Sequence, residues 1–407
     1  MKLTGGNTPW SGQDIQRFSQ LESNLSCDVL VIGGGISGAL VSYILSKQGA
    51  DTILLEKGCI GKGSTSANTG LLHFMNDDTL TELIQTLGEH KGTGFYRMCE
   101  RSVNRLSEIA SSLSVDTEFR HRSSLYYAST EDDAGKIRNE YDTLTRHGFN
   151  VEYWDRQTIK SHFPFSKPAA IYTQRDAEVN PYKLVHGLVS DAVHQGLRVF
   201  EHSGTENIEY SDNGATVKTK HGSIHARILI WAAGYETQEW KPDRIASLKS
   251  TYAIMTEPIQ DLSSWYERAL IWESSRPYLY MRTTQDNRIM AGGLDEPLHE
   301  SGCPDVNLTT RSRRLLKDIH DLFPELGKIS VACSWAGVFA STQDGIPLIG
   351  RHPHFPHSYF IEGYGGSGTV YSMLAADLLA EVANGSEPEE LNWFSLTRSL
   401  KTNSSCN

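Results

Sequence analysis

The sequence has no hydrophobic run long enough to cross a membrane. Its longest apolar stretch, residues 29–45, contains four glycines, which make it a poor candidate for a single membrane-spanning helix. The first 26 residues are polar and lack the basic start and apolar centre of a secretory signal. We therefore expect a cytoplasmic protein without a transmembrane segment.

Cysteine is scarce and scattered, and acidic residues outnumber basic ones. The six cysteines show no C-x-x-C and no paired spacing, and the fifteen histidines are dispersed, so neither a disulfide framework nor a metal site is predicted. The 38 Lys and Arg residues against 49 Asp and Glu give a net charge of −11, which leaves no broad cationic field for a nucleic acid. With 407 residues, 39% of them hydrophobic, the chain has the composition of a globular protein of two or three domains.

The chain after residue 26 has the pattern of a strand, a helix and a second strand. Residues 28–32 and 52–55 are apolar runs, and positions 36–49 between them have helical spacing. This order is typical of the β-α-β unit of a parallel sheet.

A G-x-G-x-x-G motif lies between the first strand and the helix. It consists of Gly33, Gly35 and Gly38, and Glu56 follows the second strand. These glycines permit a tight turn, close approach of a pyrophosphate and close packing of helix on strand, while a carboxylate accepts hydrogen bonds from a ribose diol. The motif predicts dinucleotide binding without separating NAD from FAD.

The same glycine spacing recurs near the C-terminus. Gly363, Gly365 and Gly368 repeat it, and Gly368 is 39 residues from the last residue. No strand that ends in an acidic residue follows, so the remaining chain is too short for a second nucleotide-binding fold. The helix predicted after this motif would point its N-terminal amides at a delocalised negative charge, which a reduced flavin carries. This second motif favours FAD.

The rest of the chain predicts a further α/β block and a separate mixed sheet. Asn213 and Gly214 predict a hairpin turn between two short strands. The other predicted elements are helices at 79–113, 181–195 and 369–384, strands at 197–200, 226–231, 278–282, 288–292 and 358–362, and a loop at 61–70.

Six segments spread over most of the chain share their order and motifs with a known family. They are 31–38 with Glu56, 63–72, 179–184, 226–234, 335–337 with 342–350, and 363–368. With them the chain resembles the FAD-dependent D-amino-acid oxidase, glycine oxidase and sarcosine oxidase superfamily. The resemblance implies an α/β protein with a glutathione-reductase-like FAD-binding Rossmann domain and a mixed-sheet α+β substrate domain.

The resemblance also implies domain limits. These are an N-terminal extension at 1–26, a discontinuous FAD-binding domain at 27–90, 170–243 and 336–400, and a substrate domain at 91–169 and 244–335.

The family resemblance implies which residues contact FAD. They are Gly33, Gly35, Ile36, Ser37, Gly38, Glu56 and Lys57 in the first motif; Ser64, Thr65, Ser66, Asn68, Thr69, Gly70 and Leu71 in the polar loop; Thr205, Ala232, Ala233 and Gly234 around the nucleotide; Gly337, Val338 and Asp344; and Gly365, Gly366, Ser367, Gly368 and Thr369 in the last motif. Without the first motif, the polar loop would be interpreted as solvated. Gly337 stands where monomeric sarcosine oxidases carry the cysteine of a covalent flavin link, so non-covalent FAD is expected.

The substrate residues depart from the family pattern. The two arginines that hold a substrate carboxylate in glycine oxidase are replaced here by Phe339 and Gly366. Tyr278, Tyr280 and Arg282 share one face of a predicted strand. Tyr278 matches a substrate-facing tyrosine of glycine oxidase, and Arg282 is equally consistent with a structural role.

Two further residues are candidates for the catalytic site. His73 follows the polar loop and Tyr364 enters the last glycine motif; each is also consistent with simple packing. The five candidate catalytic residues are therefore His73, Tyr278, Tyr280, Arg282 and Tyr364.

The resemblance implies oxidation of a C–N bond in a small amine or N-substituted amino acid, with oxygen or an electron carrier as acceptor. Hydride transfer to the flavin N5 atom needs no protein base in that case. Two alternatives stay open: oxidation of a 2-hydroxy acid with His73 as the base, and a flavoprotein whose FAD is structural. The oligomeric state is not predicted.

Overall fold

The computed structural model describes residues 2–10, 16–242, 246–299 and 301–398. Within it the chain forms two compact units. The first comprises residues 1–15, 61–187 and 248–339, and the second comprises 16–60, 188–247 and 340–407. We call them the mixed-sheet unit and the nucleotide unit and describe each by itself.

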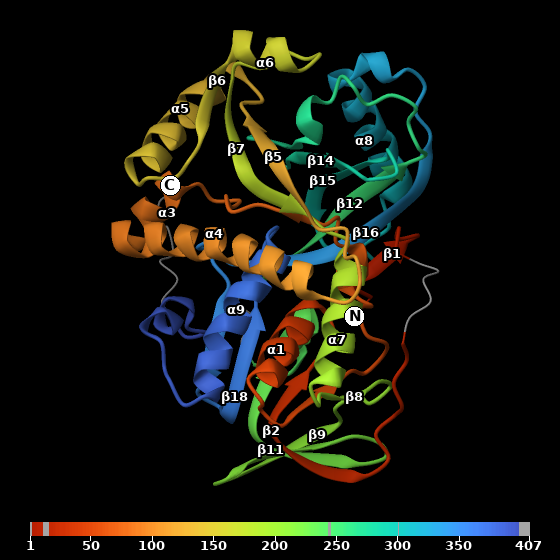
Figure 1. Ribbon diagram of the computed structural model, residues 1–407, viewed down its shortest axis with the longest axis vertical. Coiled ribbons are helices and arrows are strands. Elements are labelled where there is room, and N and C mark those ends of the chain that lie inside the picture. Colours follow the sequence, from red (N-terminus) through yellow and green to blue (C-terminus); the bar gives the residue numbers. More distant parts are fainter. Residues whose placement is uncertain (1, 11–15, 243–245, 300, 399–407) are drawn as a thin grey trace. The chain divides into compact units, whose positions relative to one another are not determined.

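The nucleotide unit is built on a mainly parallel sheet (Figure 1). Its main strands follow the order β17-β18-β11-β2-β3-β8, and the pairs from β18 to β8 are parallel. The strands are β2 (Asn24–Ile32), β3 (Thr52–Leu55), β8 (Arg198–Phe200), β9 (Asn207–Ser211), β10 (Gly214–Lys218), β11 (Ser223–Trp231), β17 (Leu348–His352) and β18 (Phe355–Glu362). The predicted β-α-β pattern and the hairpin at Gly214 are confirmed.

Two buried helices pack together in this unit. Helix α1 (Ile36–Lys47) follows β2, and α9 (Gly368–Ala383) follows β18. Both are buried over most of their circumference, which explains why they are apolar on nearly every face. The core beneath the sheet includes Trp231, which stacks on Phe360 with ring centroids 5.7 Å apart. Short 3-10 helices lie at Gly234–Glu239 and Glu389–Phe394.

The mixed-sheet unit holds a ten-stranded sheet. Its main path is β1-β16-β12-β15-β14-β13-β5-β7-β4, with β6 beside β7, and β13 runs parallel to β5. The strands are β1 (Thr4–Gly6), β4 (Leu71–Leu72), β5 (Arg120–Tyr127), β6 (Glu152–Asp155), β7 (Ala169–Glu178), β12 (Ser247–Thr256), β13 (Leu270–Glu273), β14 (Leu279–Thr283), β15 (Ile289–Pro297) and β16 (Val331–Ser341). The expected mixed sheet is therefore present.

Helices surround this second sheet (Figure 1). Helix α3 begins with a capping box, in which Thr79 accepts from the Glu82 amide and the Glu82 side chain accepts from the Thr79 amide. The helices of this unit are α2 (Ser64–Ala67), α3 (Leu80–Leu87), α4 (Glu89–Ser112), α5 (Glu131–Arg146), α6 (Arg156–His162) and α8 (Leu308–Leu322), with 3-10 turns at Tyr266–Arg268 and Pro324–Leu326. The predicted loop at 61–70 thus contains one helical turn, α2. Helix α7 (Pro181–His194) begins in this unit and ends in the nucleotide unit, where it lies beside α1 (Figure 1).

The N-terminal residues are more integrated than an extension would be. Thr4–Gly6 pairs with β16 as strand β1, and the side chains of Trp10 and Leu21 are buried. Residues 61–90 and 170–187 lie in the mixed-sheet unit, whereas the sequence placed them in the FAD-binding domain. Pairing of β4 with β7 and packing of α3 on α4 explain this grouping. The assignment of domains to ligands stays a prediction.

None of the helices in the described residues combines the length and apolar character needed to span a bilayer.

Candidate active site

The first glycine motif forms a turn that admits no larger residues. Gly33 has φ +110°, and a Cβ there would lie 2.5 Å from the carbonyl oxygen of Ala232. A Cβ on Gly38 would lie 1.8 Å from the carbonyl oxygen of Gly33. Helix α1 starts after Gly35 with no side-chain cap and no acidic residue in its first turn. Such a helix start favours an anionic ligand.

Glu56 is held beside this turn by backbone amides. Its Oε2 accepts from the Gly34 amide at 2.7 Å, and its Oε1 accepts from the Gly58 amide at 2.6 Å. Burial raises the pKa of Glu56, while these two hydrogen bonds oppose the rise. Lys57 turns away to an ion pair with Glu236 at 2.6 Å. The fixed carboxylate keeps further lone pairs for a ribose diol.

Other predicted nucleotide contacts lie in the same unit. Ala232 donates its amide to the carbonyl oxygen of Ile32, and Gly234 begins a 3-10 helix with φ +60°. The hydroxyl of Thr205 is buried and makes no hydrogen bond within the described chain. Asp344 forms a bidentate ion pair with Arg398, at 2.6 and 2.7 Å. Its carboxylate therefore anchors the C-terminal segment.

The second glycine motif brings the start of α9 beside α1. Gly363 and Gly365 have φ +69° and +52°, and α9 begins with no side-chain cap. The buried Tyr364 hydroxyl donates to the carbonyl oxygen of Ile361 at 3.0 Å and accepts from Ser37 at 2.9 Å. Burial raises the pKa of Tyr364 far above its ordinary value. Tyr364 thus ties the first turn of α1 to the end of β18, and Gly366, Ser367 and Thr369 lie around the start of α9.

The predicted flavin loop is braced within the mixed-sheet unit. The indole of Trp335 donates to the carbonyl oxygen of Ala67 at 2.8 Å, and the indole of Trp10 donates to that of Asn68 at 3.0 Å. The side chain of Asn68 accepts from the Gly70 amide at 2.7 Å. The hydroxyl of Ser64 is buried and makes no hydrogen bond within the described chain. Thr65, Ser66 and Leu71 belong to the same short segment.

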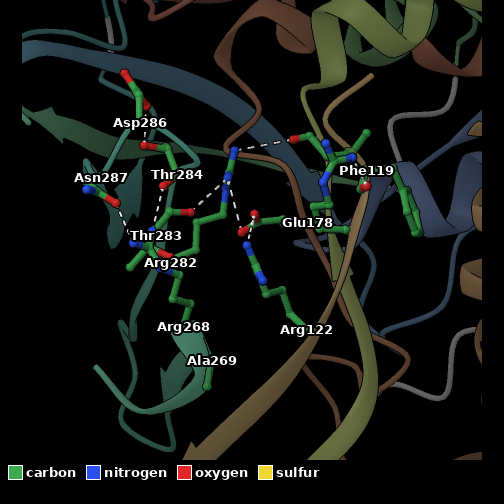
Figure 2. Close-up of polar contacts among 12 residues, drawn as sticks. Phe119, Arg122, Glu178, Arg268, Ala269, Arg282, Thr283, Thr284, Asp286 and Asn287 are labelled. Atoms are coloured by element: carbon green, nitrogen blue, oxygen red, sulfur yellow. Dashed lines mark hydrogen bonds and ion pairs between the residues drawn. The ribbon is translucent and has the colours of Figure 1, made fainter. Parts of the chain in front are cut away.

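Arg282 directs its guanidinium at the backbone of this loop, and Figure 2 shows it beside Glu178 and Arg122. It donates to the carbonyl oxygens of Thr69 at 2.7 Å and Val179 at 3.4 Å, and its Nη1 lies 3.5 Å from Glu178. Arg122 donates to the other oxygen of Glu178 at 2.8 Å. Arg282 and Glu178 are both buried. In this position Arg282 orients the loop backbone.

Two tyrosines and two charged residues lie close to one another in the mixed-sheet unit. The rings of Tyr278 and Tyr280 are 5.7 Å apart, and Arg276 covers Tyr278 at 4.7 Å. Burial raises the pKa of Asp295 to about 6 and that of Tyr280 to about 12. All four side chains keep exposed surface although surrounding protein desolvates them. Aromatic, cationic and anionic groups are therefore brought together in one place within this unit.

His73 has a carboxylate partner in the same unit. Its Nδ1 lies 3.3 Å from Oδ2 of Asp176, which also accepts from the Ser124 hydroxyl at 2.5 Å. The other Asp176 oxygen accepts from the Phe74 amide at 3.0 Å. Trp272 lies 5.4 Å from the imidazole, centroid to centroid. The fully buried Asp176 therefore fixes the ring and leaves Nε2 for other partners.

Neither position of the two absent arginines holds a charged side chain: they are Phe339 and Gly366. Phe339 is half-buried, with the Lys249 ammonium 6.0 Å from its ring. A Cβ on Gly337 would lie 3.3 Å from the Cβ of Ala67, and Val338 donates its amide to the carbonyl oxygen of Leu3.

A family model described as "FAD dependent oxidoreductase" (DAO) matches residues 28–382. The chain belongs to this family. It is similar to glycine oxidase of Bacillus subtilis (strain 168), with 24% identity over 90% of this chain and 95% of that protein, and to gamma-glutamylputrescine oxidoreductase of Escherichia coli (strain K12), with 25% identity over 90% and 86%. The crystal structure of glycine oxidase from Geobacillus kaustophilus superposes with a TM-score of 0.78, at 20% identity, over 93% of this chain and 100% of that one.

As a DAO-family oxidoreductase, the chain uses FAD. The predicted family and fold class are thereby confirmed. Its residues fit the cofactor, because the first glycine turn excludes side chains and, in the same unit, the buried hydroxyl of Thr205 is left for a ligand. An unpaired buried hydroxyl costs about 1–3 kcal/mol, which such a ligand would offset.

Sequence reasoning about this DAO-family chain missed Arg276, Asp295 and Asp176. The glycine at position 292 is the one sequence feature that relates to the tyrosines. It lies opposite Tyr280 in the sheet, and a Cβ there would lie 2.3 Å from the Tyr280 hydroxyl, so only glycine leaves room for that ring. No local pattern marks Asp176, because its contact with His73 joins segments 103 residues apart.

Proposed function

We propose that the protein oxidises a C–N bond of a small amine or N-substituted amino acid. FAD supplies a hydride acceptor at its N5 atom. Oxygen or an electron carrier then takes the electrons. The names of the relatives, a glycine oxidase and a gamma-glutamylputrescine oxidoreductase, support this class of substrate without fixing the compound.

The cluster of Tyr278, Tyr280 and Asp295 carries this proposal. Aromatic faces attract an ammonium group, and a carboxylate accepts its hydrogen bonds. The amine must be neutral to lose a hydride from its neighbouring carbon. Because burial raises the pKa of Asp295 to about 6, its carboxylate is a better proton acceptor than an ordinary aspartate.

The replacement of both carboxylate-binding arginines narrows the substrate. Without an arginine at positions 339 and 366, the carboxylate of a simple α-amino acid loses its bidentate hydrogen bonds. Arg276 offers a cationic group beside Tyr278. We therefore favour amines, or N-substituted amino acids whose carboxylate lies further from the reacting nitrogen.

A turnover screen tests this proposal. The FAD-loaded protein is assayed with an artificial electron acceptor against glycine, sarcosine, proline, D-amino acids, polyamines and 2-hydroxy acids. We expect turnover with an amine or N-substituted amino acid and formation of the carbonyl product of imine hydrolysis. Turnover confined to hydroxy acids would contradict the proposal.

One observation favours the hydroxy-acid alternative. The imidazole of His73, oriented by Asp176 at 3.3 Å, is suited to remove a hydroxyl proton. In that case His73→Gln would abolish turnover of the hydroxy acid. For an amine substrate the same variant should retain most of its turnover, because hydride transfer from the C–N carbon does not need this base.

A further inference from the structure

Three side chains that can ligate a metal meet at one edge of the nucleotide unit. They are Cys59, Glu201 and His202, and one ligand atom from each lies within 4.8 Å of the others. The thiol sulfur of Cys59 is 3.7 Å from Nε2 of His202. No other group of this kind occurs among the described residues.

Sheet topology brings these residues together although 143 positions separate Cys59 from His202. Strand β3 pairs in parallel with β8, with Leu55 opposite Phe200. The chain segments that leave parallel neighbouring strands emerge at the same sheet edge. Cys59 follows β3 by four residues, and Glu201 and His202 directly follow β8.

Backbone hydrogen bonds fix the two segments independently of the three side chains. The His202 amide donates to the carbonyl oxygen of Gly58, and the Ser203 amide donates to that of Glu56, both at 2.9 Å. The separation of the ligands is therefore set by the fold. A pre-formed set of ligands binds with less loss of conformational entropy.

We propose that Cys59, Glu201 and His202 bind a thiophilic divalent metal ion of the zinc class. Sulfur and nitrogen ligands at about 2.3 and about 2.0 Å from a tetrahedral zinc ion lie about 3.5 Å apart, close to the observed 3.7 Å. Binding releases the Cys59 thiol proton to solvent as the metal–sulfur bond forms, with no change of oxidation state. Thiolate and carboxylate then balance the charge of the dication, and water completes the coordination.

Glu201 retains the capacity for this role. Its Oε1 accepts from the Ile60 amide at 2.7 Å and its Oε2 from the Phe18 amide at 3.0 Å, which leaves one lone pair on each oxygen. Arg17 approaches Oε1 at 3.8 Å, but its side chain is 53% exposed and can turn to solvent.

Cobalt titration of the FAD-loaded protein tests the site. Tetrahedral Co²⁺ absorbs in the red, where oxidised flavin does not, and thiolate ligation adds a charge-transfer band. We expect saturation at one Co²⁺ per chain and reversal by Zn²⁺. Cys59→Ser should abolish the charge-transfer band, and His202→Asn should weaken binding about tenfold or more. Asn is chosen because residue 202 has φ +52°, which Asn tolerates.

Cys303→Ser is the matched control, since Cys303 is also a free, half-buried thiol but belongs to no such group. It should leave the titration unchanged. In parallel, Zn²⁺ should raise the midpoint of thermal unfolding of the wild type by ~2 °C or more, and not that of Cys59→Ser. Absence of the red bands in the wild type, or equal binding by Cys59→Ser, would overturn the proposal.

Discussion

The ionisation of Asp295 should determine how the rate of catalysis depends on pH. Burial raises its pKa to about 6, so the carboxylate forms as the pH rises through that value. We expect kcat/KM for an amine substrate to rise across this range. Asp295→Asn should remove this rise of kcat/KM with pH and lower kcat/KM by about tenfold or more. Asp261→Asn, which alters an exposed carboxylate, should keep the wild-type dependence of kcat/KM on pH. The same dependence in Asp295→Asn would contradict the role proposed for Asp295.

The same carboxyl should also affect stability. Its folded-state pKa of about 6 exceeds the ordinary 3.8, so its contribution favours folding at low pH and is lost as the pH rises toward 6. At pH 7 the buried charge destabilises the fold. Asp295→Asn should therefore be more stable than the wild type at pH 7, by about 1 kcal/mol after solvent screening, and not at pH 3.5. Denaturant unfolding at both pH values measures this difference, and lower stability at pH 7 would count against it.

Glu56 should control FAD affinity. Its two oxygens accept from the amides of Gly34 and Gly58, and glutamine would replace one acceptor by a donor facing an amide. We expect Glu56→Gln to weaken FAD binding by about tenfold or more, measured by the fluorescence of released flavin. Glu206→Gln changes an exposed carboxylate of the same unit and should have no effect. Equal affinity of both variants would show that Glu56 does not contact the cofactor.

At the scale of the element, the start of helix α1 depends on Gly38. A methyl group there would lie 1.8 Å from the carbonyl oxygen of Gly33, so Gly38→Ala must push α1 away from the turn. We expect loss of FAD binding and destabilisation by about 2 kcal/mol or more. Gly135→Ala, in helix α5 with nothing within 4 Å of the new methyl, should be neutral or stabilising. Retention of FAD by Gly38→Ala would contradict the role of this turn.

Elements with a strong local pattern could be predicted from the sequence. The strands at 28–32 and 52–55 and the helix after Gly35 combine periodicity with glycine punctuation, and all three are confirmed. Pairing between distant segments could not be predicted in this way. The parallel pairing of β13 with β5 and the docking of β1 on β16 depend on contacts between remote parts of the chain.

At the scale of the whole molecule, the family could be predicted because its motifs are short and retain their order. The candidate substrate-binding residues could be predicted only in part. Tyr278 and Tyr280 follow from strand periodicity, whereas Asp295 and the Asp176 partner of His73 come from other strands. Arg282 is on the expected strand, but its direction toward Thr69 depends on where the flavin loop packs.

We propose that an amine delivers its electrons to the FAD of this chain. Anaerobic mixing of the FAD-loaded protein with single amines, N-substituted amino acids and 2-hydroxy acids tests this transfer, with the visible flavin absorption as the readout. We predict bleaching by at least one amine or N-substituted amino acid, and return of the absorption when oxygen or an electron carrier is added. A flavin that dithionite bleaches but that no amine reduces would contradict the claim.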